Sequence, residues 1–88
     1  MAKKVQMMIL KSCPYCIMAF EMMETLKKQN EKYGQVEVEV IQEDVFPEIA
    51  NALDYYYVPT YFVDGKKIHE GVPTIDKVDA VFKEALRD

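Results

Sequence analysis

The chain contains two cysteines, and both lie in the segment Lys11-Ser12-Cys13-Pro14-Tyr15-Cys16. Two thiols separated by two residues are compatible with three kinds of chemistry. They can supply half of a zinc site, close a small structural disulfide, or cycle between a dithiol and a disulfide as a redox couple. The remaining sequence bears on which of these applies.

A zinc site needs four ligands, and the sequence offers only His69 beyond the two cysteines as a good further candidate. A structural disulfide across so short a loop removes little entropy from the unfolded chain, so it stabilises little. Both alternatives stay open, but neither accounts well for the pair. We therefore favour a redox-active dithiol, with no metal and no tightly bound cofactor.

The two thiols are predicted to have unequal roles, because Pro14 favours a helix that begins directly after Cys13. Cys13 would then cap the helix, where the free N–H groups of Tyr15 and Cys16 and the positive end of the helix dipole favour an anion. Lys11 would add positive potential. We predict that Cys13 is the thiolate nucleophile and that Cys16, one turn further in, is the resolving thiol.

The first half of the chain predicts the elements that position this pair. An apolar run from Val5 to Leu10 is typical of a buried strand. Helical spacing follows from Pro14 to about Lys32, and Gly34 is predicted to close that helix. The apolar stripe of the helix is predicted to contain Cys16, Ile17, Phe20, Met23, Leu26 and Lys27.

The second half predicts two strands, a hairpin and two helices. Residues 35–40 alternate as in an edge strand, and a short helix is expected within residues 44–54. Residues 60–63 and 67–70 form a hairpin through Asp64-Gly65. Thr74 caps the last helix, whose apolar face is predicted to contain Ile75, Val78, Val81, Phe82, Ala85 and Leu86. The result is an α/β mixed sheet with helices on both faces.

Length and composition restrict the function classes. The 88 residues predict a single domain spanning residues 1–88, and the net charge of −4 argues against nucleic acid as a partner. No segment has the apolar length of a membrane helix, and the N-terminal apolar run is too short for a signal peptide. We expect a cytoplasmic monomer without a membrane partner.

The dipeptide Val58-Pro59 precedes the strand that is predicted to pair with the first one. Bonds before proline are where cis peptides occur. A cis bond here would turn the N–H and C=O of Val58 outward, ready to pair with an extended, peptide-like substrate. An ordinary proline at a strand boundary is the simpler alternative.

Taken together, Cys-Pro-Tyr-Cys after an apolar strand, Val58-Pro59 and the hairpin Phe62-Val63-Asp64-Gly65 resemble the glutaredoxin family of the thioredoxin fold. The resemblance covers essentially the whole chain in the expected order. It implies a βαβαββα arrangement with a four-stranded mixed sheet flanked by helices. It also implies a glutathione-dependent enzyme that reduces protein disulfides and glutathione mixed disulfides, with glutathione as co-substrate.

By this resemblance, Cys13 attacks the glutathionylated sulfur and Cys16 resolves intramolecular disulfides. Tyr15 lines the glutathione groove, Val58 bonds the cysteinyl backbone of glutathione, and Pro59 is cis. The partners would be glutathione and disulfide-containing or glutathionylated proteins.

The resemblance places four further residues around glutathione. Lys11 would bind its glycyl carboxylate, and Thr74 would meet its γ-glutamyl carboxylate at the helix cap. Gly71 and Val72 belong to the same predicted glutathione site.

Two other functions remain open. One is a thioredoxin-like protein recharged by a flavoprotein reductase. The other, from a different class, is an iron–sulfur carrier in which Cys13 thiolates and glutathione hold a cluster between two subunits. Outside the motif, Tyr55-Tyr56-Tyr57 is predicted to be core and hairpin packing, and an edge of the substrate groove beside Val58 is the alternative. His69 is predicted to be a surface strand residue.

Overall fold

The computed structural model describes residues 2–87 and contains one four-stranded sheet with the strand order β2-β1-β3-β4. Its elements follow one another as strand, helix, strand, helix, strand, strand and helix, with a 3₁₀ helix after the first helix. Their bounds are β1 Val5–Ile9, α1 Pro14–Gln29, η1 Glu31–Gln35, β2 Val38–Gln42, α2 Pro47–Asn51, β3 Thr60–Val63, β4 Lys66–Glu70 and α3 Ile75–Leu86. The predicted α/β thioredoxin fold is therefore confirmed.

The sheet is mixed, as predicted. Strand β2 runs parallel to β1, with Val5 opposite Val38, and α1 forms the crossover between them. Strand β3 is antiparallel to both β1 and β4. The β3–β4 hairpin turns at Asp64 and Gly65, which both have positive φ angles, so the turn chemistry read from the sequence is correct.

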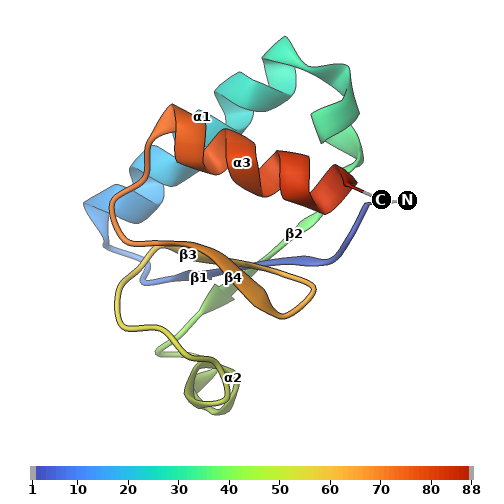
Figure 1. Cartoon of the computed structure of the whole chain (residues 1–88). Coiled ribbons are helices and arrows are strands. Elements are labelled where there is room, and N and C mark those ends of the chain that lie inside the picture. Colours follow the sequence, from blue (N-terminus) through green and yellow to red (C-terminus); the bar gives the residue numbers. More distant parts are fainter. Residues whose placement is uncertain (1, 88) are drawn as a thin grey trace.

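Helices cover both faces of the sheet (Figure 1). Helices α1 and α3 lie on one face, over the larger hydrophobic core, and α2 lies on the other face. The larger core contains Val5, Met7 and Ile9 of β1 together with Cys16, Val78 and Phe82. The smaller core contains Met8, Ile41 and Phe62, against which Ile49 and Leu53 pack. Because successive side chains of β1 point to opposite faces of the sheet, this strand contributes residues to both cores.

The first helix ends earlier than the sequence predicts. Helix α1 stops at Gln29, and Asn30 turns the chain into η1, with its side chain accepting a hydrogen bond from the Lys32 N–H at 3.1 Å. Gly34 lies inside η1 and does not close α1, so that prediction is wrong. Because η1 takes up residues 31–35, the edge strand β2 begins at Val38 and not at residue 35.

Two apolar faces also differ from the prediction. Ile17 on α1 is exposed, and the buried position beside Cys16 on the helix is Ala19 instead. Ile75, in the first turn of α3, is exposed as well. Helix α2 spans only Pro47–Asn51, because the preceding residues form a turn and proline occupies the first helical position. Among the described residues, no helix is long and apolar enough to cross a membrane.

Candidate active site

Cys13 lies where the chain passes from the sheet to the first helix. Strand β1 ends at Ile9, and the N–H of Cys13 donates to the Leu10 carbonyl at 3.2 Å. Cys13 is the N-cap of α1, in extended backbone conformation, with Pro14 at the first helical position. The position predicted from the motif is thus the position observed. Cys13 is half-buried, whereas Cys16 is buried.

Cys16 lies one turn further along and is only 1% exposed, in the core between α1, β1 and α3. Burial raises the pKa of its thiol to about 11, and the neighbouring Cys13 and the carboxylate of Glu43 act in the same direction. The backbone of Leu10 opposes the rise without reversing it. Cys16 therefore stays protonated at neutral pH, as expected of a thiol that acts second.

The sulfur of Cys13 is not held as the sequence analysis expected. Its side chain forms no capping hydrogen bond, and the N–H of Cys16 donates to the backbone carbonyl of Cys13 at 3.1 Å. The Cys13 sulfur instead lies 3.9 Å from the carbonyl oxygen of Val58. The prediction that backbone N–H groups point at the sulfur is wrong, because the thiol is directed at the carbonyl of Val58 in another loop.

The Val58–Pro59 peptide bond is cis, as the resemblance implies. The neighbouring backbone groups are engaged: the Thr60 hydroxyl donates to the Tyr57 carbonyl, and the N–H of Gly71 donates to the Pro59 carbonyl at 2.9 Å. Within residues 2–87, no acceptor is paired with the Val58 N–H. A half-buried residue with a free backbone donor therefore stands beside the reactive sulfur.

The remaining predicted site residues differ in exposure and in their contacts with the cis-proline segment. Lys11 is exposed in the loop between β1 and α1, and Tyr15 is exposed in the first turn of α1. Gly71 is joined to the cis-proline segment through its N–H and has a φ of 93°, which favours glycine. Val72 is exposed directly after it.

Thr74 caps α3 as predicted. Its hydroxyl oxygen accepts a hydrogen bond from the Lys77 N–H at 3.2 Å, and its carbonyl accepts one from the Val78 N–H. The cap therefore has a structural role, and the hydroxyl hydrogen is still free to donate. Asp76 brings a negative charge into the same first turn, which opposes binding of a second carboxylate there.

Two residues at the end of β4 contact the segments around the candidate site, although the sequence analysis did not assign them there. The carboxylate of Glu70 accepts hydrogen bonds from the N–H groups of Tyr56 and Tyr57, the latter at 2.9 Å. His69 is only 7% exposed, so its assignment to the surface is wrong. Its Nε2 lies 3.0 Å from the carbonyl oxygen of Gly71. The strand register places His69 opposite the buried Tyr61, which no local sequence pattern indicates.

The tyrosine run divides between core and surface. Tyr55 contacts the smaller core and donates its hydroxyl to Glu43 at 2.8 Å, in line with the packing prediction. Tyr56 and Tyr57 are 84% and 71% exposed, so the prediction of packing is wrong for them. Their backbone N–H groups donate to Glu70, and the two side chains lie in solvent.

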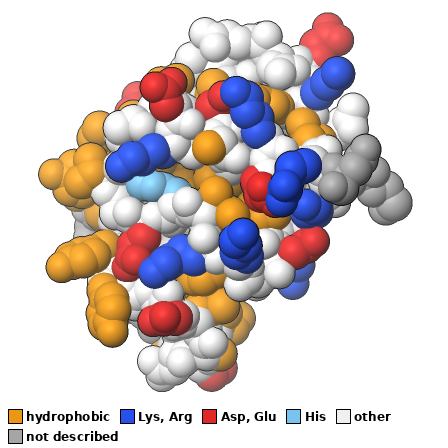
Figure 2. Space-filling view, viewed as in Figure 1, with side chains coloured by type: hydrophobic (Ala, Val, Ile, Leu, Met, Phe, Trp, Pro, Cys, Tyr) orange, Lys and Arg blue, Asp and Glu red, His pale blue; other side chains and the backbone are white. Residues whose placement is uncertain are grey.

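Hydrophobic side chains gather at the end of the molecule that carries Cys13. In Figure 2 they protrude along the left edge of the view, the edge at which α1 begins and the chain enters β3 and leaves β4 in Figure 1. Elsewhere on this face, lysine and arginine alternate with aspartate and glutamate. The exposed apolar residues of these segments are Tyr15, Ile17, Met18, Tyr56, Tyr57, Val72 and Ile75.

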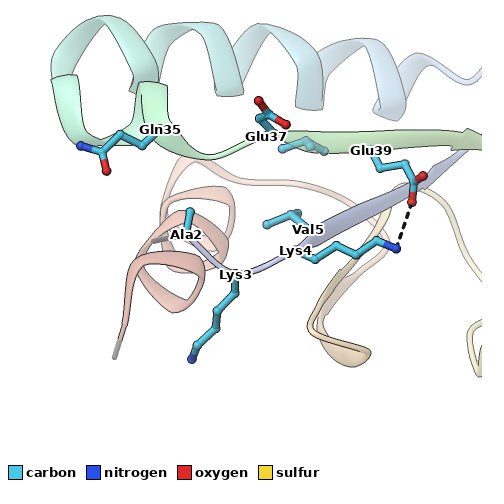
Figure 3. A pocket seen from close by; sticks show the side chains of 8 residues that line it. Ala2, Lys3, Lys4, Val5, Gln35, Glu37 and Glu39 are labelled. Carbon is cyan, nitrogen blue, oxygen red and sulfur yellow. Dashed lines mark ion pairs between the residues drawn. The ribbon is translucent and has the colours of Figure 1, made fainter.

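One cavity in the described part of the chain lies away from the cysteines. It has a volume of about 600 Å³ and lies at the start of β1 and β2, where Lys4 and Glu39 pair at 3.8 Å (Figure 3). Cys13 follows the opposite end of β1, so this cavity is separate from the candidate site. Within residues 2–87, no group of three or more His, Cys, Asp and Glu side chains is placed to hold a metal ion.

The sequence and the structure of this chain are similar to those of known proteins. A family model described as a thioredoxin domain matches residues 2–83. No curated protein matches the sequence significantly. Among the solved structures that share the fold, three are informative, and the first is a malarial protein with 18% identity and a TM-score of 0.73, aligned over 99% of this chain and 100% of that one.

The other two structures carry functional names. A protein disulfide oxidoreductase from Aeropyrum pernix has 26% identity and a TM-score of 0.68 over 96% of this chain, which spans only 38% of that protein. A mutant thioredoxin from Halobacterium salinarum has 25% identity and a TM-score of 0.65, over 96% of this chain and 75% of that one.

Proposed function

This chain belongs to the thioredoxin-domain family, and from that premise we propose that it is a thiol–disulfide oxidoreductase that uses Cys13 and Cys16 as its redox couple. The observation that carries the proposal is the asymmetry of the pair. Cys13 is accessible at a helix N-terminus, whereas Cys16 is buried with its pKa raised to about 11. Attack and resolution need thiols that differ in this way.

In the proposed reaction, the thiolate of Cys13 attacks one sulfur of a substrate disulfide. A bond forms between the Cys13 sulfur and that sulfur, and the other substrate sulfur leaves as a thiolate, which takes up a proton. Cys16 then loses its proton and attacks the Cys13 sulfur, which releases the second substrate thiolate. The proton from Cys16 balances that second thiol. Two electrons pass from the protein dithiol to the substrate disulfide, and Cys13–Cys16 becomes the oxidised form.

Substrate recognition is proposed to use the backbone of Val58. Its carbonyl oxygen lies 3.9 Å from the Cys13 sulfur and its N–H is free, and an extended peptide can pair with such groups as an added strand does. This pairing would hold the cysteine of the substrate opposite Cys13. The same groups would accept either a protein segment or the cysteinyl residue of glutathione.

We further propose that glutathione returns the oxidised pair to the dithiol form. Two glutathione molecules supply two electrons and two protons and leave as one glutathione disulfide. The Cys-Pro-Tyr-Cys motif, exposed Tyr15 and the nearby Val58 support this assignment. Lys11 would pair with one carboxylate of glutathione, and the Thr74 hydroxyl would donate to the other.

A flavoprotein reductase is the second candidate donor. It is favoured by the apolar residues around Cys13, which suit a protein partner better than a small charged tripeptide. The negative charge of Asp76 beside the Thr74 cap points the same way. The iron–sulfur carrier has no comparable observation in its favour.

A side-by-side assay decides between the donors. The protein is oxidised and then reduced either with glutathione, glutathione reductase and NADPH, or with thioredoxin reductase and NADPH. We expect faster NADPH consumption in the glutathione arm. A faster thioredoxin reductase arm would support the second donor and leave the dithiol chemistry intact. Failure of both arms, together with no reduction of insulin disulfides by the dithiothreitol-reduced protein, would contradict the proposed function.

A further inference from the structure

The carboxylate of Glu70 joins the end of β4 to the segment before the cis-proline. It accepts the N–H groups of Tyr56 and Tyr57 and is paired with the Lys67 ammonium at 2.7 Å. The side chain of Glu70 is only 18% exposed. These charge-assisted contacts hold the pKa of Glu70 down, at about 2, so the carboxylate is ionised at every physiological pH.

The two tyrosines are exposed on a segment whose backbone is held by this contact. The carboxylate of Glu70 fixes two consecutive backbone N–H groups, while the attached rings lie in solvent. The segment is tied again immediately downstream, by the Thr60 hydroxyl on the Tyr57 carbonyl and by the Gly71 N–H on the Pro59 carbonyl. Exposed aromatic rings on a backbone fixed at several points are typical of contact surfaces.

These contacts do not use the backbone N–H of Val58, and its carbonyl lies at the Cys13 sulfur. Val58 lies between the tied residues, with its N–H free and its carbonyl beside the Cys13 sulfur. The segment from Tyr56 to Val58 therefore presents two aromatic rings followed by a strand-pairing position. A short disulfide reaches only the pairing position, whereas a longer chain also reaches the rings.

Resting on the proposed function, we infer that Glu70 is a positioning residue that fixes Tyr56 and Tyr57 as an aromatic contact for an extended segment of a protein disulfide substrate. The site would thereby prefer protein disulfides to small ones. The cysteine motif does not assign this role to Glu70. The role follows from contacts with residues that lie 13 and 14 positions earlier in the sequence and that only the folded chain brings to Glu70.

The test compares Glu70→Ala with the unmodified protein on two substrates, insulin and 2-hydroxyethyl disulfide, under one regenerating system. We expect KM for insulin to rise roughly tenfold, the effect of losing hydrogen bonds to a charged group, while kcat is nearly unchanged. The kinetics on the small disulfide should stay within about twofold, because that substrate does not reach the rings. Glu70→Gln keeps an acceptor and should restore part of the affinity for insulin.

Two further experiments distinguish a positioning role of Glu70 from a general loss of stability. Amide hydrogen exchange should accelerate at Tyr56 and Tyr57 in Glu70→Ala, while amides in β1 stay protected. Tyr56→Ala combined with Tyr57→Ala should reproduce the KM effect with Glu70 intact. The matched control is Glu84→Gln, which removes another ion-paired carboxylate, paired with Lys3 and Arg87 far from Cys13.

An equal loss on both substrates, or a loss confined to kcat, would overturn the inference, since it would mean that Glu70 supports the redox centre itself. Unchanged insulin kinetics in Glu70→Ala would overturn it too. If the unmodified protein reduces neither substrate, the proposed function fails instead, and the exchange measurement still reports whether Glu70 holds the segment.

Discussion

The sulfur of Cys13 lies 3.9 Å from the carbonyl oxygen of Val58, although 45 positions separate the two residues in the sequence. The sheet creates this proximity, because β1 leads into the Cys13 loop and its antiparallel neighbour β3 begins directly after Val58-Pro59. A substrate that pairs with the Val58 backbone would present its disulfide to this sulfur. The contact would thus join the proposed nucleophile to the proposed binding position.

The accessibility of the two thiols predicts their order of alkylation. With its pKa at about 11, Cys16 is only about 0.1% thiolate at pH 8. It is also buried, so iodoacetamide should modify Cys13 first in the reduced protein. Peptide mapping by mass spectrometry follows the two sites separately. The labelling rate of Cys16 should climb roughly tenfold per pH unit up to about pH 11. Faster labelling of Cys16 than of Cys13 at pH 8 would refute the assigned roles.

The buried His69 predicts a pH dependence of stability. Burial lowers its pKa below 6.5, and the charge of Lys77 acts in the same direction, against the Gly71 carbonyl and Glu70, which raise it. A lowered pKa in the folded state means that the unfolded chain binds the proton more readily. The stabilisation is therefore present above pH 6.5 and lost as the pH falls through the folded-state value.

Urea unfolding at pH 7 and at pH 5 measures this effect. The midpoint should fall at pH 5 in the unmodified protein, and the fall should be smaller in His69→Gln, which keeps a donor for the Gly71 carbonyl but does not titrate. The lowered carboxyl pKa values of Glu70, Asp79 and Glu84 act only at lower pH. Equal pH dependence in both proteins would show that His69 is not responsible.

The Thr74 cap predicts a stability effect that is independent of redox chemistry. Its hydroxyl oxygen satisfies the Lys77 N–H, so Thr74→Ala should lower the free energy of unfolding by about 1 kcal/mol. Thr25→Ala is the matched control, because the Thr25 hydroxyl only bonds back to the Glu21 carbonyl within α1. Urea unfolding should show little loss for the control. Similar losses in both variants would argue that Thr74 does not cap α3.

The local features of this protein were the most predictable from its sequence. Pro14 fixes the start of α1 and hence the cap position of Cys13, and Asp64-Gly65 fixes the hairpin, because both depend on residues adjacent in the chain. The end of α1 was missed because Gly34 is permitted, but not required, to stop a helix. The side chain of Asn30 ends it earlier.

The long-range features could not be predicted in this way. The burial of His69 depends on its position opposite Tyr61 in the sheet, and the role of Glu70 depends on a loop that returns to β4. The direction of the Cys13 sulfur likewise depends on Val58 and not on the helix alone. Each of these needs the arrangement of strands, which the local residue pattern does not determine.

The most direct test of the central claim is trapping of the mixed disulfide with insulin. Cys16→Ser removes the resolving thiol and keeps the attacking one, so the reduced variant should accumulate a covalent adduct at Cys13, detected by non-reducing electrophoresis and peptide mapping. Cys13→Ser should form no adduct and should not reduce insulin. An adduct at Cys16 in Cys13→Ser, or insulin reduction by that variant at the unmodified rate, would contradict the mechanism.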